Sequence, residues 1–181
     1  PDLTTDDQSK QGSSGGPITQ DNTSVESYCT IFTIAESPLD PGVLWVGSDD
    51  GIVSVTQDGG ATWSDVTPPR LPAYSLISMI DASPHDAGTA YVAVNRYKHD
   101  EFAPYVYRTN DYGAHWERID DGIDSEAFVR VVRADPEVPG LLYAGTETGV
   151  YLSYDDGWTW ESLQNDLPVV PITDLVVKDG D

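Results

Sequence analysis

Three copies of one phrase decide the fold of this chain: Thr56-Gln57-Asp58-Gly59-Gly60-Ala61-Thr62-Trp63, Thr109-Asn110-Asp111-Tyr112-Gly113-Ala114-His115-Trp116 and Ser153-Tyr154-Asp155-Asp156-Gly157-Trp158-Thr159-Trp160. They share the order Ser or Thr, x, Asp, x, Gly, x, x, Trp, and their starts lie 53 and 44 residues apart. This period is typical of units that each form a four-stranded propeller blade. The repeat therefore predicts an all-β fold, a partial β-propeller of about three four-stranded antiparallel blades.

Each fixed position of this phrase has a physical task in a tight hairpin. The Asp carboxylate accepts backbone N–H bonds across the turn, and the hydroxyl at the first position adds a local bond. Glycine supplies a backbone conformation that is costly for other residues, and the Trp is expected to pack across the turn. His115 stands where Thr is usual. We assign this structural role to Thr56, Asp58, Gly60, Trp63, Thr109, Asp111, Gly113, Trp116, Ser153, Asp155, Gly157 and Trp160.

The repeat extends beyond these hairpins. Residues 37–42 can be aligned with 83–88 and 135–140, and each copy is followed by a strand-like run. Breaks at Pro, Gly and Asp clusters then divide each blade into four strands. The expected strands are 29–35, 43–47, 51–56 and 62–67; then 75–82, 89–95, 105–109 and 115–119; then 127–134, 141–146, 149–154 and 159–163. The predicted blades span about 27–68, 69–121 and 122–166, with the first strand of a fourth at about 171–178 and an irregular lead-in or linker at 1–26.

The charge balance limits the partners of the chain. It has 31 acidic against nine basic residues, a formal net charge of −22. DNA, RNA and anionic membranes are therefore excluded as expected partners, because they require basic surfaces. The balance would suit divalent cations or a basic protein surface, although a solvated acidic exterior is the simpler interpretation. No apolar run is long enough to cross a bilayer, and the single Cys29 is expected to pack in the core.

No group of residues points to catalysis, and we predict no catalytic residue, metal or cofactor. A serine-nucleophile elbow, a P-loop and a zinc signature are all missing, and the three histidines lack ligand-like spacing. Acidic residues are too numerous for a carboxylate pair of the kind used in glycoside hydrolysis to be chosen. Residues 49–50 and 120–124 offer oxygen ligands for calcium, but ordinary acidic turns explain them more simply.

From about residue 25 onward the chain resembles the bacterial BNR-repeat (Asp-box) propellers related to the sortilin (VPS10) ectodomain, which are often labelled glycosyl hydrolases. The resemblance rests on the three boxes and on the linking phrases at 34–38, 143–151 and 167–172. It implies an exported protein with more blades than three, and hence a periplasmic, cell-surface or secreted location. Three blades are too few to close a ring, so the remaining blades or a protein partner must cover the exposed strand edges.

An insertion at 96–104 supplies the candidate binding loop. In a four-stranded meander it lies on the face opposite to the Asp boxes, together with the lead-in. It concentrates basic and aromatic side chains in an acidic chain, a composition suited to protein recognition, while a longer hairpin tip is the simpler interpretation. The candidate binding residues are Arg96, Tyr97, Lys98, His99 and Phe102.

These observations favour a non-catalytic protein-binding or scaffolding propeller segment. We expect an accessory subunit of a larger extracytoplasmic assembly, whose partner can belong to a membrane complex although the chain has no transmembrane segment of its own. The alternative is an excerpt of a secreted carbohydrate-active propeller whose catalytic residues lie in other blades.

Overall fold

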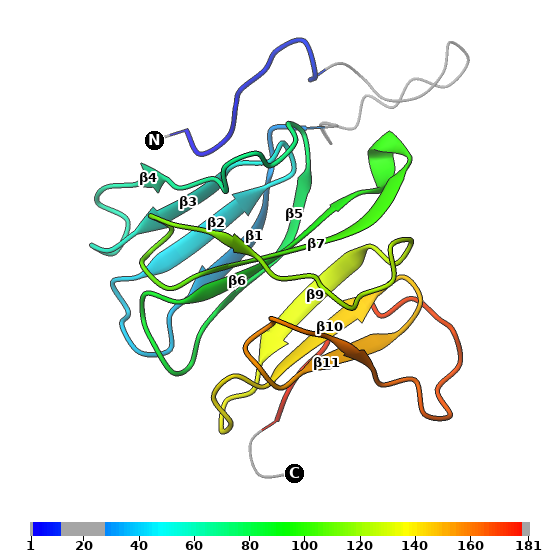
Figure 1. Ribbon diagram of the computed structural model, residues 1–181. Coiled ribbons are helices and arrows are strands. Elements are labelled where there is room, and N and C mark those ends of the chain that lie inside the picture. The colour runs from blue at the N-terminus through cyan, green and yellow to red at the C-terminus, as the bar shows by residue number, and fades with distance from the viewer. Residues whose placement is uncertain (1, 12–27, 179–181) are drawn as a thin grey trace.

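The computed structural model describes residues 2–11 and 28–178 and has the predicted all-β architecture (Figure 1). Its strands form three separate antiparallel sheets of four strands each, in which every strand pairs with its neighbour in sequence. Blade 1 contains β1 (Ile31–Glu36), β2 (Leu44–Ser48), β3 (Val53–Thr56) and β4 (Ser64–Asp65). Blade 2 contains β5 (Leu76–Ala82), β6 (Ala90–Arg96), β7 (Glu101–Thr109) and β8 (Glu117–Arg118). Blade 3 contains β9 (Val129–Ala134), β10 (Leu142–Thr146), β11 (Val150–Ser153) and β12 (Glu161–Ser162).

The fourth strand of each blade is much shorter than the sequence predicts. β4, β8 and β12 have two residues each, and both residues of each strand are exposed. Each is the outermost strand and pairs on one side only. In blade 1 the chain then runs into Pro68 and Pro69, which have no N–H group to continue a ladder.

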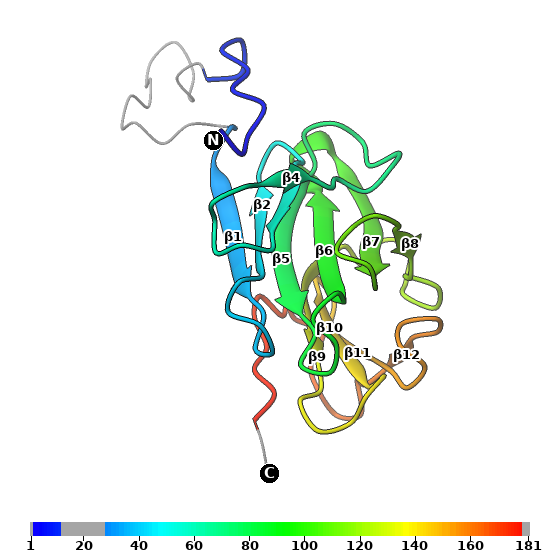
Figure 2. The same ribbon diagram turned by 90° about the vertical axis from the view of Figure 1, so that its left-hand side faces the viewer.

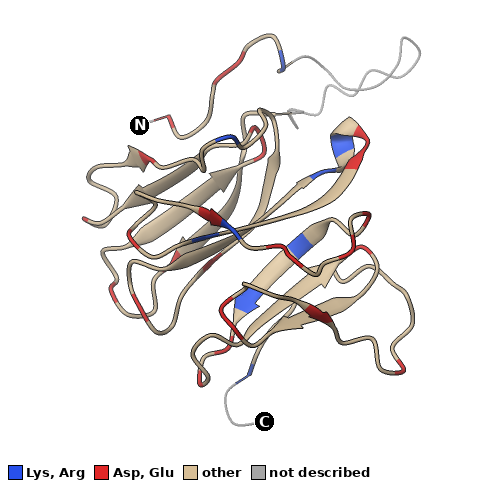
Figure 3. Cartoon of the chain, in the orientation of Figure 1, with Lys and Arg blue, Asp and Glu red and all other residues tan. Residues whose placement is uncertain are grey.

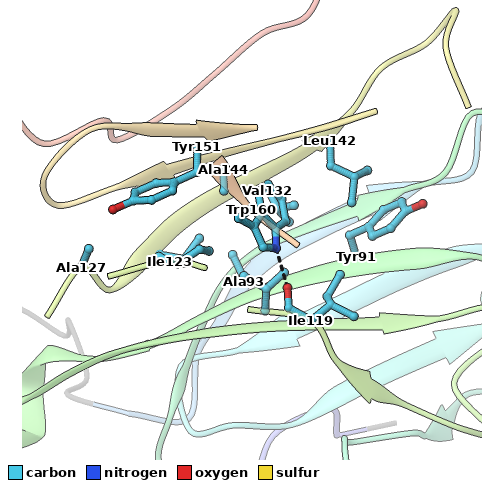
Figure 4. Packing of buried hydrophobic residues seen from close by; sticks show 12 residues of the cluster. Tyr91, Ala93, Ile119, Ile123, Ala127, Val132, Leu142, Ala144, Tyr151 and Trp160 are labelled. Atoms are coloured by element: carbon cyan, nitrogen blue, oxygen red, sulfur yellow. Dashed lines mark hydrogen bonds between the residues drawn. The ribbon is translucent and has the colours of Figure 1, made fainter. Parts of the chain in front are cut away.

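The sheets pack face to face through apolar side chains that alternate along the strands. On β6, Val92 and Val94 belong to the core between blades 1 and 2, whereas Tyr91 and Ala93 belong to the core between blades 2 and 3. Side chains at the centres of both cores are fully buried, Trp45 and Leu142 among them. Figure 4 shows the second core, with residues from both blades directed at one another.

Blade 1 has one face that no other blade covers. On β1 the hydroxyl of Thr33 is turned toward blade 2, where it accepts a hydrogen bond from the Ile80 N–H at 3.3 Å. Phe32 and Ile34 alternate with it and are 57% and 66% exposed. Because these positions lie on a first strand, the exposed apolar face is where a preceding blade would pack.

The two ends of the described chain lie against the blades (Figure 2). In the lead-in, Thr5 binds the carboxylate of Asp50, which lies in the β2–β3 turn, through its N–H and its hydroxyl, both at 2.7 Å. Residues 12–26 of the predicted linker lie outside the described residues. At the other end, residues 171–178 have no strand assignment, although the N–H of Ile172 donates to Thr146 O at 2.9 Å. Their assignment to a fourth blade stays a prediction.

Candidate binding face and the Asp-box hairpins

The three Asp-box hairpins share one hydrogen-bond pattern. In the first, the Asp58 carboxylate accepts bonds from the Thr62 N–H at 2.8 Å and the Thr62 hydroxyl at 2.6 Å. The Thr56 hydroxyl donates to Asp58 at 2.7 Å and accepts from the Gly60 N–H at 3.0 Å. In the second hairpin His115 replaces Thr62, and its Nδ1 lies 2.6 Å from Asp111. The boxes thus close their own turns, and their carboxylates are occupied by local donors.

These local donors change the acidity of the box carboxylates. Hydrogen bonds from the Thr62 side chain and backbone and from Thr56 lower the pKa of Asp58 from 3.8 to about 2. The His115 side chain lowers the pKa of Asp111, and the Thr159 backbone N–H lowers that of Asp155. Each box Asp is therefore held in its charged form, as expected for a carboxylate that accepts several bonds.

The stability that Asp58 contributes should depend on pH in a defined window. Its pKa is lower in the folded chain than in the unfolded chain, so its contribution is complete above about pH 4 and is lost as the pH falls toward about 2. We expect the difference in melting temperature between the wild-type chain and Asp58→Asn to be constant from pH 7 to about 4 and to shrink below that. Circular dichroism melts across this range measure it. A difference that stays constant down to pH 2 would contradict the assignment.

The box tryptophans also join neighbouring blades. The indole N–H of Trp116 donates to Val66 O of blade 1, and that of Trp160 donates to Ile119 O of blade 2, both at 2.6 Å. Figure 4 shows the second of these bonds. Trp63 lies over its own turn, where a Cβ on Gly60 would be 3.8 Å from its ring. Within the described residues its indole N–H has no acceptor. We call the bond from a box tryptophan to the preceding blade the tryptophan joint.

On the opposite face, the insertion forms the tip of the β6–β7 hairpin. It contains a single turn of 3-10 helix, η1 (Tyr97–His99), and β7 begins at Glu101, four residues earlier than the predicted strand at 105. Asp100 takes a left-handed conformation with φ of 55° where η1 ends. The insertion is therefore a structured hairpin end, visible in green at the upper right of Figure 1.

The basic residues of the insertion are directed toward blade 1. Arg96 forms an ion pair with Glu101 at 2.6 Å and donates to Ala73 O at 3.0 Å. Lys98 Nζ lies 5.0 Å from the centre of the Tyr28 ring, and His99 Nε2 lies 3.1 Å from Tyr74 O. These three predicted binding residues thus hold the insertion against the chain that leads into blades 1 and 2.

The aromatic residues of the insertion are directed toward blade 3. Tyr97 stacks on Phe128 with ring centres 5.9 Å apart, and Phe102 lies 6.1 Å from the same ring. The guanidinium of Arg130 lies 4.8 Å from the Phe128 ring and forms an ion pair with Glu147 at 2.6 Å. Tyr97 and Phe102 remain 43% and 42% exposed. We call Tyr97, Phe102, Phe128 and Arg130 the aromatic platform.

The sequence predicted only two of the four residues of the aromatic platform. Tyr97 and Phe102 were predicted from the insertion, but Phe128 and Arg130 come from the start of blade 3. A signal was present, because Phe128 directly precedes β9 where Ser75 directly precedes β5. The exchange of serine for a large aromatic residue at this position could have marked the contact.

The carboxylates in the acidic turns of this face accept hydrogen bonds from other groups of the same chain. Asp49 accepts a hydrogen bond from the Thr30 N–H at 2.9 Å, and Asp50 accepts bonds from Thr5 and Ser48. Burial raises the pKa of Asp49, whereas the hydrogen bonds from Ser48 and Thr5 outweigh burial and lower that of Asp50. In the described ranges no three His, Cys, Asp or Glu side chains are grouped to hold a metal ion. Nor does any helix there have the length and apolar character to cross a membrane.

Basic residues are few. Figure 3 shows them on β9 and in the η1 hairpin and also on other segments of the chain, while acidic residues lie mostly in the turns and loops. On β9, Arg133 lies 3.0 Å from Asp81 of β5 and 3.3 Å from Asp174 of the C-terminal segment. It therefore connects blades 2 and 3 and the segment that follows them, which is a structural task.

The repeated sheets, their box hairpins and the tryptophan joints define the chain as a section of a β-propeller. No family model matches the sequence. Its curated relatives include a probable oligoxyloglucan-reducing end-specific xyloglucanase of Neosartorya fischeri, 29% identical over 106 residues, and the corresponding enzyme of Emericella nidulans, 26% identical. Each match covers 58% of this chain and 13% of the relative, so the chain spans a small part of those proteins.

Solved structures share the fold at low sequence identity. YCF48 from Cyanidioschyzon merolae is 24% identical with a TM-score of 0.55, over 74% of this chain and 36% of that one. A structure described as YCF48 bound to D1 peptide is 20% identical with a TM-score of 0.61, over 77% of this chain and 43% of that one. The GH74 xyloglucanase from Xanthomonas campestris is 17% identical with a TM-score of 0.60, over 86% and 24%. These similarities confirm the propeller fold.

Proposed function

We propose that this chain is a non-catalytic, protein-binding section of an extracytoplasmic Asp-box propeller of the sortilin-like type. In this proposal its blades span 27–68, 69–121 and 122–166, residues 171–178 begin a further blade, and it serves as an accessory part of a larger assembly. The observation that carries the proposal is the aromatic platform. Two exposed aromatic rings are held there around a third by contacts from two different blades.

Such a platform has the composition of a binding hot spot. Aromatic residues and arginine dominate the energetics of protein interfaces, because they offer large contact areas at a low entropy cost. Here Phe128 is 3% exposed and fixes the Tyr97 and Phe102 rings, whose outer faces stay in solvent. A partner would gain contact area without having to order the rings. The YCF48 structure with a bound D1 peptide supports a peptide- or protein-binding role for this kind of propeller.

Site-specific photocrosslinking tests the platform. A photoreactive benzoylphenylalanine at position 97 of the full-length protein, expressed in its own cells, should give a discrete adduct with a protein. The same group at Tyr154 is the matched control, because Tyr154 is 70% exposed and lies on an Asp-box hairpin of the opposite face. The same adduct from both positions, or none from position 97, would count against the platform.

A carbohydrate-active propeller is the second candidate, and the relatives named as xyloglucanases favour it. In that case the chain would be a section of a secreted enzyme whose catalytic residues lie in other blades. A hydrolysis screen of the full-length protein on xyloglucan oligosaccharides separates the two functions. Release of shorter saccharides would support the enzyme and would leave the platform without its proposed task.

A further inference from the structure

A groove of about 530 Å³ lies between blades 1 and 2. One wall is the link from β4 to β5, and the other is formed by side chains of β7, β8 and the second box. Its lining residues are Pro69, Arg70, Pro72, Tyr105, Tyr107, Trp116 and Arg118. The platform, in contrast, lies between blades 2 and 3, so the groove is a separate feature and does not rest on the function proposed above.

The repeat provides an internal comparison for this groove. The N–H of Leu71 bonds to Pro68 O as that of Ile123 bonds to Asp120 O, so Leu71 corresponds to Ile123 and Arg70 to Gly122. Between blades 2 and 3, Ile123 and Trp160 are buried in the shared core at 8% and 4% exposure. Between blades 1 and 2, Leu71 and Trp116 are only partly buried, and the exposed Arg70 stands where the next link has glycine. The junction of blades 1 and 2 is therefore less completely filled than that of blades 2 and 3.

Arg70 has an unusual backbone and no partner. Its φ is 67°, in the left-handed region, and Gly122, at the corresponding position of the next link, has a φ of 97°. Left-handed conformations of residues other than glycine are costly and are enriched at functional positions. In the part of the chain that the structure describes, its guanidinium forms no hydrogen bond, ion pair or ring contact. A free guanidinium is uncommon in a chain with a net charge of −22.

A second polar group in the groove is also unpaired. Tyr107 as a whole is 7% exposed, but its hydroxyl keeps contact with solvent and forms no hydrogen bond within the described residues. Arg118 completes the set: its guanidinium stacks on the Tyr105 ring at 4.4 Å and binds Asp120 through Nε at 2.6 Å. Its Nη2 donates to Pro104 O at 2.9 Å, which leaves Nη1 without an assigned bond.

We propose that this groove binds an extended peptide segment that carries a glutamate or aspartate beside proline or aromatic residues. The carboxylate would lie between Arg70 and Arg118 and accept a bond from the Tyr107 hydroxyl, while the apolar residues would contact Trp116 and the two prolines. Guanidinium groups match carboxylates in charge and geometry. Aromatic grooves with proline at their walls suit extended, proline-containing peptides.

The groove is lined mainly by hydrogen-bond donors, which suits a peptide carboxylate better than a saccharide. Guanidinium groups donate and never accept, and the acceptors among the side chains that line the groove are the Tyr105 and Tyr107 hydroxyl oxygens. A neutral sugar presents hydroxyl donors that would find too few acceptors there. A polyanion would be repelled by the acidic surface around the groove, so a ligand with one or two charges fits best.

Fluorescence anisotropy with a labelled probe peptide tests the proposal. The probe is Gly-Pro-Glu-Pro-Tyr-Gly amide, and its matched control replaces Glu by Gln. We expect the Glu peptide to bind about tenfold more tightly at low salt, and Arg70→Gln to remove most of this preference. Tyr107→Phe should weaken binding about threefold to tenfold without lowering the melting temperature, because the hydroxyl it removes has no partner in the fold.

The control variant is Lys178→Gln, which makes the same change in net charge in the C-terminal segment. It should leave probe binding unchanged. Equal affinity for the Glu and Gln peptides, no binding of the Glu peptide at millimolar concentration, or an equal loss in Arg70→Gln and Lys178→Gln would each overturn the proposal. So would displacement of the probe by glucuronic acid oligosaccharides at lower concentrations than by unlabelled peptide, because the groove would then be a saccharide site.

Discussion

Trp160→Ala is expected to lower the free energy of unfolding by about 3–5 kcal/mol, the largest effect of a single substitution that we predict. Trp160 is 4% exposed and lies in the core between blades 2 and 3. The substitution would leave a large cavity there and would deprive the buried Ile119 carbonyl of its indole donor. Equilibrium unfolding in urea, followed by circular dichroism, measures the change.

Trp63→Ala is the matched control, since Trp63 has the same place in the first Asp box. Its indole N–H has no acceptor within the described residues, and no blade of this chain packs over it. We expect a loss of about 1 kcal/mol or less, as for substitutions outside a packed core. If both variants lost the same free energy, the tryptophan would act within its own hairpin and the joint between blades would carry little stability.

The second large effect is expected for Gly113→Ala, at about 2–4 kcal/mol of unfolding free energy. Gly113 has a φ of 85°, and a Cβ built on it would lie 2.6 Å from Cβ of Val66 in blade 1. Valine is a stiff, branched side chain, so it cannot swing away, and the two blades would have to separate. Thermal and urea unfolding of the variant would report this cost.

Gly60→Ala separates the two sources of that cost, which are the left-handed backbone and the clash with Val66. Gly60 has nearly the same φ, 91°, but a Cβ there would approach only the Trp63 ring, at 3.8 Å. It should therefore show the cost of the left-handed backbone alone, about 1 kcal/mol. The difference between the two variants measures how closely blade 2 must approach blade 1. Equal losses would mean that the box glycine serves its turn and not the packing of blades.

Much of the fold could be predicted because the contacts that close each repeat hairpin are local in sequence. The box Asp, Gly and hydroxyl positions close a hairpin with bonds that span at most four residues, as between Thr62 and Asp58, and such contacts can be inferred from spacing. The positions of the strands followed from the alignment of the three repeats. The errors lie where ladder length depends on neighbours: β8 shortens to two residues, and β7 begins earlier because it pairs with Arg96 across the hairpin.

The candidate sites could be predicted only in part. The insertion was visible as basic and aromatic residues, but its division into two groups depends on how blades rotate relative to one another. That rotation places Phe128 beneath Tyr97 and Tyr74 beside His99, at sequence separations that no local pattern encodes. The groove was hidden for a different reason: Arg70 occupies the left-handed turn position that Gly122 occupies in the next link, and a search for functional motifs does not weigh such an exchange.

The tryptophan joint gives the row of blades a polarity. Every joint donates from one blade to the carbonyl of the blade before it, so the two ends of the row differ. In blade 1 the Trp63 indole N–H has no acceptor among the residues that the structure describes. Blade 3 presents Leu163, whose N–H bonds to Val150 O at 2.8 Å just as that of Val66 bonds to Val53 O. An interface built from unlike halves is heterologous: it cannot form a twofold dimer, and each unit added through it continues the same rotation. A further blade that continued either joint would therefore add head to tail.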